Sequence, residues 1–337
     1  MSARSADLDP VPALDGLSVL LSAPILFFAL GIAAALIGTE LPLPEGFDKT
    51  LASYLIVALG LKGGAALASN GDPSAYLPVL LAGAGLSFAL PFLAFALLRA
   101  ATRLDRLNAA AVAAHYGSVS LVTFIAAGRF VEGQGLAYGG HMVAVLAVME
   151  APAIVSGLIL AGRDPALAAR PGAPAPVGTV LREALTNGSV VLLVGALAVG
   201  MAVGQPGLDK LAGFFVAPFD GVLCLFLLAM GFVATRRLRE ARSLTPALVG
   251  FALAMPLLGG ACGLGLGWAL GLGTAELTLF TTLAASCSYI AVPAALRHAL
   301  PSADPAVSMP LALAVTFPFN IMVGIPLYHG WAAAVAG

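Results

Sequence analysis

The long apolar stretches of this chain constrain its fold more than any other feature. Of its 337 residues, 60% are hydrophobic and only 10% are charged, whereas soluble proteins carry about 25% charged residues. A helix needs roughly 20 apolar residues to cross the hydrocarbon core of a bilayer. Stretches of this length recur from Val19 to the C-terminus. The sequence therefore predicts an all-α integral membrane protein.

Ten such stretches are separated into two sets of five by a charged, proline-rich segment. The predicted spans are 18–38, 49–69, 76–99, 107–128, 138–162, 179–203, 217–235, 244–271, 275–298 and 306–335. The segment 163–178 contains two arginines, an aspartate and four prolines. We predict a polar N-terminal tail (1–17), a first five-helix repeat (18–162), a cytoplasmic linker (163–178) and a second five-helix repeat (179–337).

Two polar clusters interrupt corresponding helices of the two halves. Gly117-Ser118-Val119-Ser120 lies near the centre of the fourth stretch, and Ser286-Cys287-Ser288 near the centre of the ninth. The serines are 168 positions apart, and the same offset relates Arg129 to Arg297. An odd number of helices in each half inverts the second half in the membrane. The pattern predicts two inverted five-helix repeats with broken fourth and ninth helices, an arrangement that points to a transporter's binding site.

Lysine and arginine predict the orientation. Ten spans place both termini on one side of the membrane and the linker on the other. The side with the termini has three lysines and arginines, and the side with the linker has twelve. Because cytoplasmic loops are enriched in lysine and arginine, we expect the linker in the cytoplasm and both termini outside, in a bacterial inner membrane. The N-terminal tail lacks the basic region of a cleaved signal peptide, so the first span is expected to remain in the protein.

The broken helices predict a site for a small ion. A helix that begins at mid-membrane offers unpaired N–H groups and the positive end of a helix dipole, which suit an anion. Serine hydroxyls can also serve a cation as oxygen ligands. The alternative is that these serines bond to carbonyls of the preceding turn and only bend the helix.

Few ionisable or polar groups lie within the spans, and each has a functional and a structural interpretation. Glu150 is a candidate sodium ligand or proton-coupling carboxylate, or a buried neutral acid. Thr316 and Asn320 are candidate sodium ligands or helix-packing residues. His115 is a proton-relay candidate or a packing residue, and Lys62 attracts an anion or extends to the membrane interface.

Several function classes are excluded by the sequence. The net charge of −1 and the lack of a large basic cluster argue against nucleic acid as a partner. No phosphate-binding, metalloprotease or paired-carboxylate motif is present, so we expect neither an enzyme nor an organic cofactor. The three cysteines lie in apolar stretches without metal-ligand spacing. Membrane lipid is the expected surrounding partner.

Several motifs resemble the sodium-dependent bicarbonate permease family. They are Gly60-Leu61-Lys62-Gly63-Gly64, His115-Tyr116-Gly117-Ser118-Val119-Ser120, Ala284-Ala285-Ser286-Cys287-Ser288-Tyr289-Ile290-Ala291-Val292-Pro293, Leu300-Pro301-Ser302-Ala303-Asp304-Pro305 and Gly324-Ile325-Pro326-Leu327. They occur in the family's order, over residues 20 to 335. The resemblance implies core and gate domains, a homotrimer, and sodium-coupled uptake of bicarbonate. It also implies a small PII-like cytoplasmic regulator.

The resemblance places the anion site between the two broken helices. The matching residues are Gly117, Ser118, Val119, Ser120, Ser286, Cys287 and Ser288. Sodium is then expected near Ser118, Ser120, Ser288, Glu150, Thr316 and Asn320, with Lys62, His115 and Tyr289 as accessory candidates. Tyr289 stands where the cyanobacterial members have an acidic residue, and the linker is shorter than theirs, so this chain resembles a divergent member of the family.

Other functions remain open from the residues alone. The same fold could carry another small anion, coupled to protons through Glu150 or His115, or uncoupled. An anion channel or a membrane-embedded sensor is a further alternative, which the repeated halves do not favour.

Overall fold

The computed structural model describes residues 22–44, 46–69, 73–162, 178, 182, 185–241 and 244–336. Within these ranges helices are the regular secondary structure and strands are absent, so the prediction of an all-α protein is confirmed. The predicted N-terminal tail, and all of the predicted linker except Gly178, lie outside the described residues.

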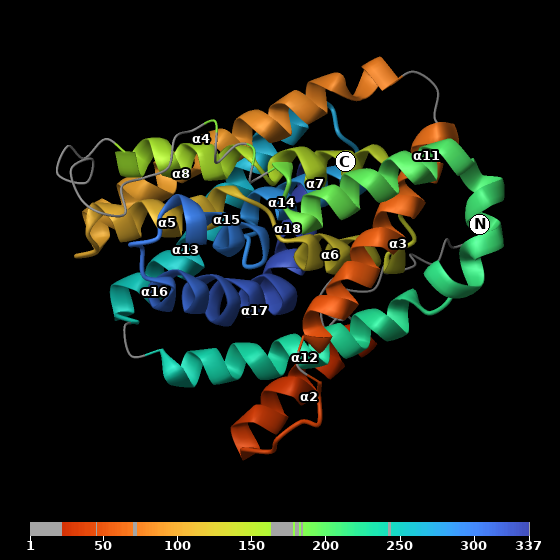
Figure 1. Ribbon diagram of the computed structural model, residues 1–337. Coiled ribbons are helices and arrows are strands. Elements are labelled where there is room, and N and C mark those ends of the chain that lie inside the picture. The colour runs from red at the N-terminus through yellow and green to blue at the C-terminus, as the bar shows by residue number, and fades with distance from the viewer. Residues whose placement is uncertain are drawn as a thin grey trace, which may run out of the picture.

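The helices follow the predicted spans in order (Figure 1). They are α2 (Ala23–Ile37), α3 (Phe47–Ser69), α4 (Leu77–Ala101), α5 (Arg106–Gly117), α6 (Leu121–Gly133), α7 (His141–Met149), α8 (Pro152–Gly162), α11 (Gly188–Phe215), α12 (Phe219–Glu240), α13 (Pro246–Ala269), α14 (Thr274–Ala285), α15 (Ala291–Ala299), α16 (Pro305–Pro310), α17 (Phe317–Phe319) and α18 (Ile325–Ala336). The short 3₁₀-helix η1 (Pro73–Tyr76) precedes α4, and the π-helical segments η2 (Leu311–Thr316) and η3 (Asn320–Gly324) flank α17.

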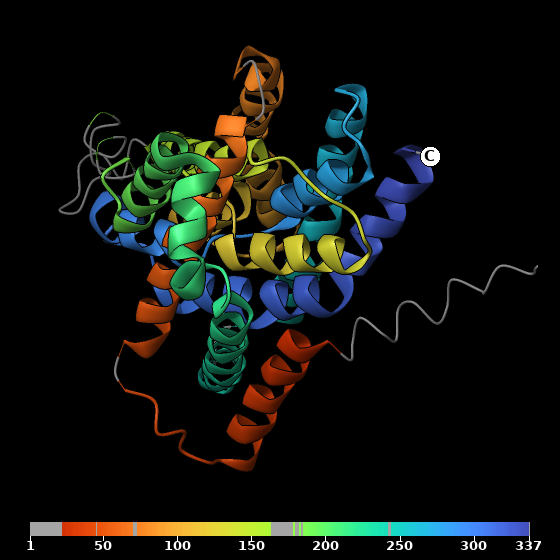
Figure 2. The same ribbon diagram turned by 90° about the vertical axis from the view of Figure 1, so that its right-hand side faces the viewer.

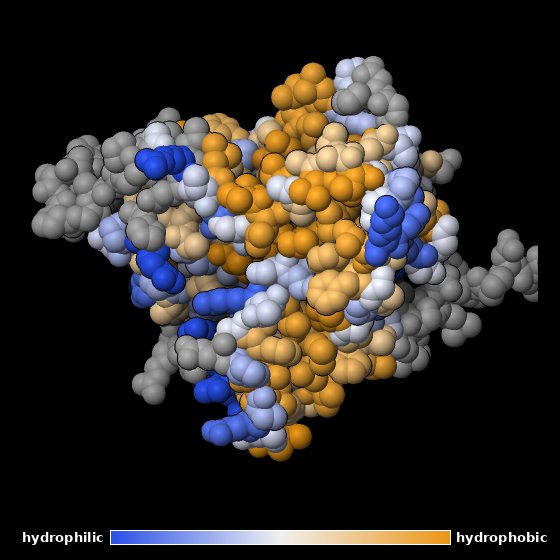
Figure 3. All heavy atoms as spheres, turned by 45° about the vertical axis from the view of Figure 1, so that its right-hand side comes forward, coloured by the Kyte–Doolittle hydropathy of each residue, from blue (hydrophilic) through white to orange (hydrophobic). Residues whose placement is uncertain are grey.

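Eight helical segments in the described part of the chain are long and apolar enough to cross a membrane. Within the described residues the first predicted span contains α2, which has 15 residues, about 22 Å at the rise of an α-helix. The ninth is divided into α14 and α15. The total of ten spans therefore remains a prediction. Figure 3 shows the broad apolar surface of these helices, with polar residues gathered at its edges.

The sixth predicted span ends at residue 203, where the helical conformation is interrupted. Gly204 has φ 59° and ψ −168°, which are not helical values, and a second helical stretch follows this kink to Phe215, the last residue of α11. Glycine tolerates this positive φ because it has no Cβ, and the following proline fits the first turn of the continuing helix.

Helices α2, α3, α11 and α12 form what we call the crossing group, in which α2 packs on α12 and α3 packs on α11 (Figure 2). Glycines allow both contacts: a Cβ at Gly31, Gly64, Gly200 or Gly231 would lie 2.1 to 2.4 Å from a backbone oxygen of the facing helix. Gly31 and Gly200 are 169 positions apart, and Gly64 and Gly231 are 167 apart. The two crossings thus use glycines that nearly match the 168-residue offset.

The remaining helices, α4–α8 and α13–α18, form what we call the broken-helix group. The α5–α6 segment is almost wholly buried inside it. The halves hold each other reciprocally at the helix starts. Asn108, in the first turn of α5, accepts a hydrogen bond from the Asp304 N–H before α16 (2.8 Å). Glu276, in the first turn of α14, accepts one from the Gly139 N–H before α7 (3.3 Å).

Candidate functional site

The chain leaves the helical conformation at both serine clusters. Helix α5 ends at Gly117 and α6 begins at Leu121, whereas α14 ends at Ala285 and α15 begins at Ala291. Ser120 starts α6 as its N-cap, because its Oγ accepts a hydrogen bond from the Thr123 N–H (3.2 Å). These backbone breaks lie inside the protein, where polar groups find partners that hydrocarbon lacks.

The two breaks are bonded directly to each other. The Ser120 N–H donates to the Ser286 Oγ (2.9 Å), and the Ser288 N–H donates to the backbone oxygen of His115 (2.9 Å). The Nδ1 of His115 lies 2.5 Å from the Ser288 carbonyl oxygen. A carbonyl oxygen only accepts, so Nδ1 carries the proton in this contact. His115 therefore helps to fix the second break, which the sequence alone did not indicate.

A third break, which was not predicted, lies in the fifth span. Helix α7 ends at Met149 and α8 begins at Pro152. The Ser118 Oγ donates to the backbone oxygen of Glu150 (3.0 Å), and the Ser87 Oγ donates to that of Met149 (2.7 Å). The available signal was Pro152, because proline cannot donate the helical hydrogen bond and crowds the preceding turn.

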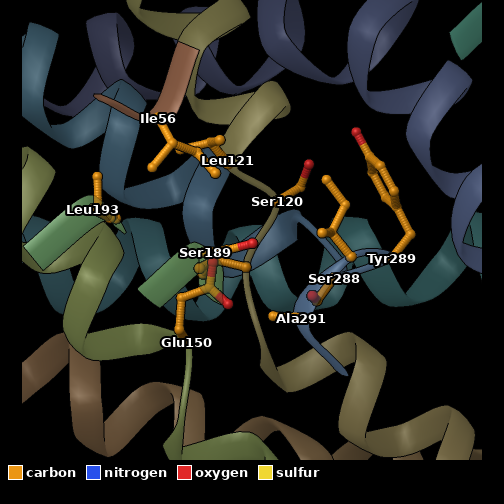
Figure 4. A pocket seen from close by; sticks show the side chains of 11 residues that line it. Ile56, Ser120, Leu121, Glu150, Ser189, Leu193, Ser288, Tyr289 and Ala291 are labelled. Atoms are coloured by element: carbon orange, nitrogen blue, oxygen red, sulfur yellow. The ribbon is translucent and has the colours of Figure 1, made fainter. Parts of the chain in front are cut away.

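A small cavity of about 20 Å³ lies where these breaks meet (Figure 4). Its lining consists of Ile56, Val119, Ser120, Leu121, Glu150, Ser189, Leu193, Ser288, Tyr289, Ile290 and Ala291. Ile56 belongs to α3, and Ser189 and Leu193 belong to α11. The cavity therefore lies at the contact between the crossing group and the broken-helix group.

The chemistry of the cavity is set by oxygen atoms. Glu150 is 6% exposed, and its Oε2 is buried without a hydrogen-bond partner. Ser120 and Ser288 each accept one N–H hydrogen bond, from Thr123 and Val292. A hydroxyl has two acceptor lone pairs, so each keeps capacity for a ligand. A carboxylate among hydroxyls suits a hard cation.

The cavity's size limits what it holds in this conformation. A volume of about 20 Å³ accommodates a single water-sized group. A sodium ion fits such a space, whereas bicarbonate, a planar oxyanion larger than water, does not. An anion that binds between the breaks must enter in a conformation where the two groups are further apart.

Part of the predicted site lies at this cavity. Val119, Ser120, Ser288, Glu150 and Tyr289 line it. Ser189 also lines it and was missed, because nothing in the sequence marks a serine near the start of the sixth span as facing the fourth and ninth. The remaining predicted residues do not line it, namely Gly117, Ser118, Ser286, Cys287, Thr316, Asn320, Lys62 and His115.

Thr316 and Asn320 are engaged by protein groups. The Thr316 Oγ1 donates to the backbone oxygen of Ala252 (2.7 Å) and lies 2.7 Å from the Tyr116 hydroxyl. The Asn320 amide donates to the Ala285 oxygen (2.9 Å), and its Oδ1 accepts from the Tyr328 hydroxyl (2.9 Å). Asn320 thus satisfies the last carbonyl of α14, which agrees with the helix-packing interpretation.

The other candidates have varied surroundings. Cys287 is buried, and its Sγ donates to the Ala312 oxygen (3.4 Å). The ring of Tyr289 packs edge-on against Phe317 with centroids 5.2 Å apart. The Nζ of Lys62 lies 5.4 Å from the ring centroid of Phe219. Gly117 packs against Pro91 so closely that a Cβ would lie 2.3 Å from its Cγ.

A comparison with protein families matches nearly the whole chain. The model of the Na⁺-dependent bicarbonate transporter superfamily covers residues 23–333. This is a family of transporters and not of enzymes, which confirms both the resemblance and the exclusion of an enzyme. No curated protein matches the chain.

Proposed function

Because this multi-pass membrane transporter belongs to the Na⁺-dependent bicarbonate transporter superfamily, we propose that it takes up bicarbonate together with sodium by alternating access. One observation carries the proposal. The two broken helices meet at a small cavity lined by Glu150, whose carboxylate Oε2 is buried without a hydrogen-bond partner.

The anion binds between the starts of α6 and α15. The first N–H groups of a helix have no intrahelical acceptor, so those of Leu121 and Val122 are available at the start of α6. Both helix starts direct positive dipole ends toward the breaks. The residues proposed for the anion are those predicted, Gly117–Ser120 and Ser286–Ser288. After the cavity widens, the backbone N–H groups at the two breaks would bind the oxygen atoms of an oxyanion and so select for it.

Sodium binds beside Glu150. Of the predicted ligands, Glu150, Ser120 and Ser288 line the same cavity, and Ser189 adds a hydroxyl from the crossing group. Ser118 acts indirectly, since it holds the Glu150 backbone. The cation neutralises the buried carboxylate, which would otherwise repel an incoming anion and pay a large desolvation cost. Coupling follows because the anion binds well only when sodium is present.

The broken-helix group acts as the core domain and the crossing group as the gate domain. The reciprocal bonds at Asn108 and Glu276, and the glycine crossings of α2–α12 and α3–α11, support an inverted repeat. Sliding of one group along the other would open the cavity to alternate sides. We place the protein in the bacterial inner membrane, with its termini outside the cell membrane and the linker on the cytoplasmic side. The homotrimer and the PII-like regulator rest on the resemblance alone.

A proton-coupled transporter of another small anion is the second candidate. It is favoured by the single carboxylate at the cavity and by Tyr289, which brings no second acidic group to it. Glu150 would then bind and release the proton itself, as the one acidic side chain among the described residues that line the cavity.

Uptake of labelled bicarbonate into proteoliposomes tests the proposal. We expect uptake that is stimulated by an inward sodium gradient and unaffected by a proton gradient of the same size. Uptake without sodium dependence would remove the coupling, and stimulation by protons would favour the second candidate. A lack of bicarbonate uptake, with uptake of another anion from a panel, would remove the substrate.

A further inference from the structure

A cluster of charged side chains joins the two helix groups away from the cavity. The Nε of Arg129, near the end of α6, lies 2.7 Å from the Oδ1 of Asp220, in the first turn of α12. A second nitrogen of Arg129 lies 2.5 Å from the Oε2 of Glu132 on its own helix. The first contact therefore links the broken-helix group to the crossing group.

Phe219 strengthens this link. Its ring is buried, with 2% exposure. The guanidinium carbon of Arg129 lies 4.8 Å from the ring centroid, and the Nζ of Lys62 on α3 lies 5.4 Å from it. Both distances are within the range of cation–π attraction. One aromatic side chain of the crossing group thus contacts a cation from each group.

The charges of the cluster argue against an anion-binding role. Lys62 and Arg129 are balanced by Glu132 and Asp220, so the cluster offers no net positive field to an anion. Its strength is also limited. The Asp220 side chain is 67% exposed, and the buried Nε of Arg129 makes no aligned hydrogen bond despite its short distance to Asp220. Such a contact is weak enough to form and break within a transport cycle.

A cleft between the two groups opens next to this contact. Its volume is about 530 Å³, and residues of α2, α6, α12 and α18 line it. Arg129 and Asp220 lie in its wall, together with Cys224. Cys224 follows Asp220 by one helical turn, so both lie on the same face of α12. It is 8% exposed and is a free thiol.

We propose that the Arg129–Asp220 contact, which packs on Phe219, keeps this cleft from widening and separates when the two helix groups move relative to each other. The proposal rests on the alternating-access mechanism proposed above. Arg129 and Asp220 are conformational groups and do not touch the transported ions.

The reactivity of the Cys224 thiol reports whether the cleft has widened. The purified full-length protein in lipid nanodiscs is treated with a water-soluble maleimide, and labelling of each cysteine is resolved by peptide mass spectrometry. Two variants are compared, Arg129→Gln and Asp220→Asn. Each removes the contact, and we expect each to accelerate Cys224 labelling by up to about five-fold, the range for an exposed ion pair.

The opposite charges of the two variants separate opening from a direct electrostatic effect. A nearby charge changes thiol reactivity, but loss of the cation and loss of the anion would change it in opposite directions. Acceleration in both variants therefore indicates opening, and opposite signs or unchanged rates would overturn the proposal. Asp209→Asn is the matched control, because Asp209 is exposed on α11 and bonds only to Gln205 of the same helix among the described contacts. It should leave labelling unchanged.

Charge exchange gives a second, independent test. Asp220→Arg alone brings a third cation beside Lys62 and Arg129, and should accelerate labelling more than Asp220→Asn does. Combining it with Arg129→Asp restores opposite charges, and should return labelling toward the rate of the unaltered protein. A double variant that labels as fast as the single one would contradict a pairwise contact. The labelling needs no substrate, so its outcome is distinct from success or failure of bicarbonate uptake.

Discussion

The break between α5 and α6 and the break between α14 and α15 are related by the 168-residue offset in the sequence, yet different hydrogen bonds fix them. Ser118 donates to the Glu150 backbone on a third element, whereas its equivalent, Ser286, donates to Leu283 on its own helix (2.8 Å). Ser120 caps α6 directly, whereas Ser288 bonds to Val292, past the cap residue of α15. Besides the bonds that join the two breaks, the serine hydroxyls thus tie the first break to the fifth span and the second break to its own flanking helices.

The site is also asymmetric in charge. Glu150 in the fifth span leaves an unpartnered carboxylate oxygen at the cavity. In the tenth span, Asn320 lies at a similar depth but is bonded to Ala285 and Tyr328. Two similar helix starts therefore share one anionic group, which belongs to the first half. We infer that the anion uses both halves, and that the negative charge that binds the coupled cation comes from the first half while hydroxyls from both halves complete its site.

The largest effect on transport is expected from Glu150→Gln, which removes the charge difference between the two halves of the site. Interactions with a charged group contribute roughly 1.5–3 kcal/mol, so the sodium concentration for half-maximal uptake should rise by roughly 10- to 100-fold. Initial rates of labelled bicarbonate uptake against sodium concentration measure this. Glu276→Gln is the matched control, because the amide oxygen still accepts from Gly139. Unchanged sodium dependence in Glu150→Gln would exclude Glu150 from the coupling site.

Alanine substitutions at the glycines of the α2–α12 and α3–α11 contacts test whether the two halves are also equivalent in the crossing group. A Cβ at Gly31 or at Gly200 would lie 2.1 or 2.4 Å from a backbone oxygen, so alanine at either position must separate two helices. We expect each variant to lower the free energy of unfolding by about 1–3 kcal/mol. Thermal unfolding of the purified protein measures the loss. Gly85→Ala, where nothing lies within 4 Å, is the control. A neutral effect at only one of the two glycines would break the symmetry of the crossings.

The serines sharpen the comparison of the breaks. Ser118→Ala removes the hydrogen bond to the Glu150 backbone oxygen, and should mainly raise the sodium concentration needed for half-maximal uptake. Ser286→Ala leaves the buried Ser120 N–H without its acceptor, at a cost of about 1–3 kcal/mol, and should weaken bicarbonate binding and lower the unfolding temperature. Uptake kinetics varied separately in sodium and in bicarbonate distinguish the two. Identical kinetic changes in both variants would show that the breaks act alike.

The sequence predicted those features that depend on local chemistry. Glycine and serine interrupt a helix through their own backbone and side chain, so the breaks at residues 118–120 and 286–288 could be located. Ser189 could not be identified, because its role depends on α11 packing against two distant breaks. The pairing of Asn320 with Ala285 is likewise a tertiary contact, which the sequence alone does not reveal.

The smallest effect is expected at Arg297, the equivalent of Arg129. Arg297 lies near the end of α15, and it lines a cavity of about 570 Å³ together with Arg237 of α12 and Ala241, which follows α12. It therefore lies, like Arg129, at the boundary between the two helix groups. An inverted repeat puts this boundary on the opposite face of the membrane, where closing it should accompany opening of the cleft at Cys224.

Arg297→Gln should therefore slow Cys224 labelling, opposite in sign to Arg129→Gln. The change should be less than about five-fold, because Arg297 is an exposed residue. The nanodisc assay measures it, and Arg103→Gln, an exposed arginine that does not line this cavity, is the control. Acceleration by Arg297→Gln would mean that both arginines restrain the same opening. The cleft near Arg129 and the cavity near Arg297 would then open together rather than alternately.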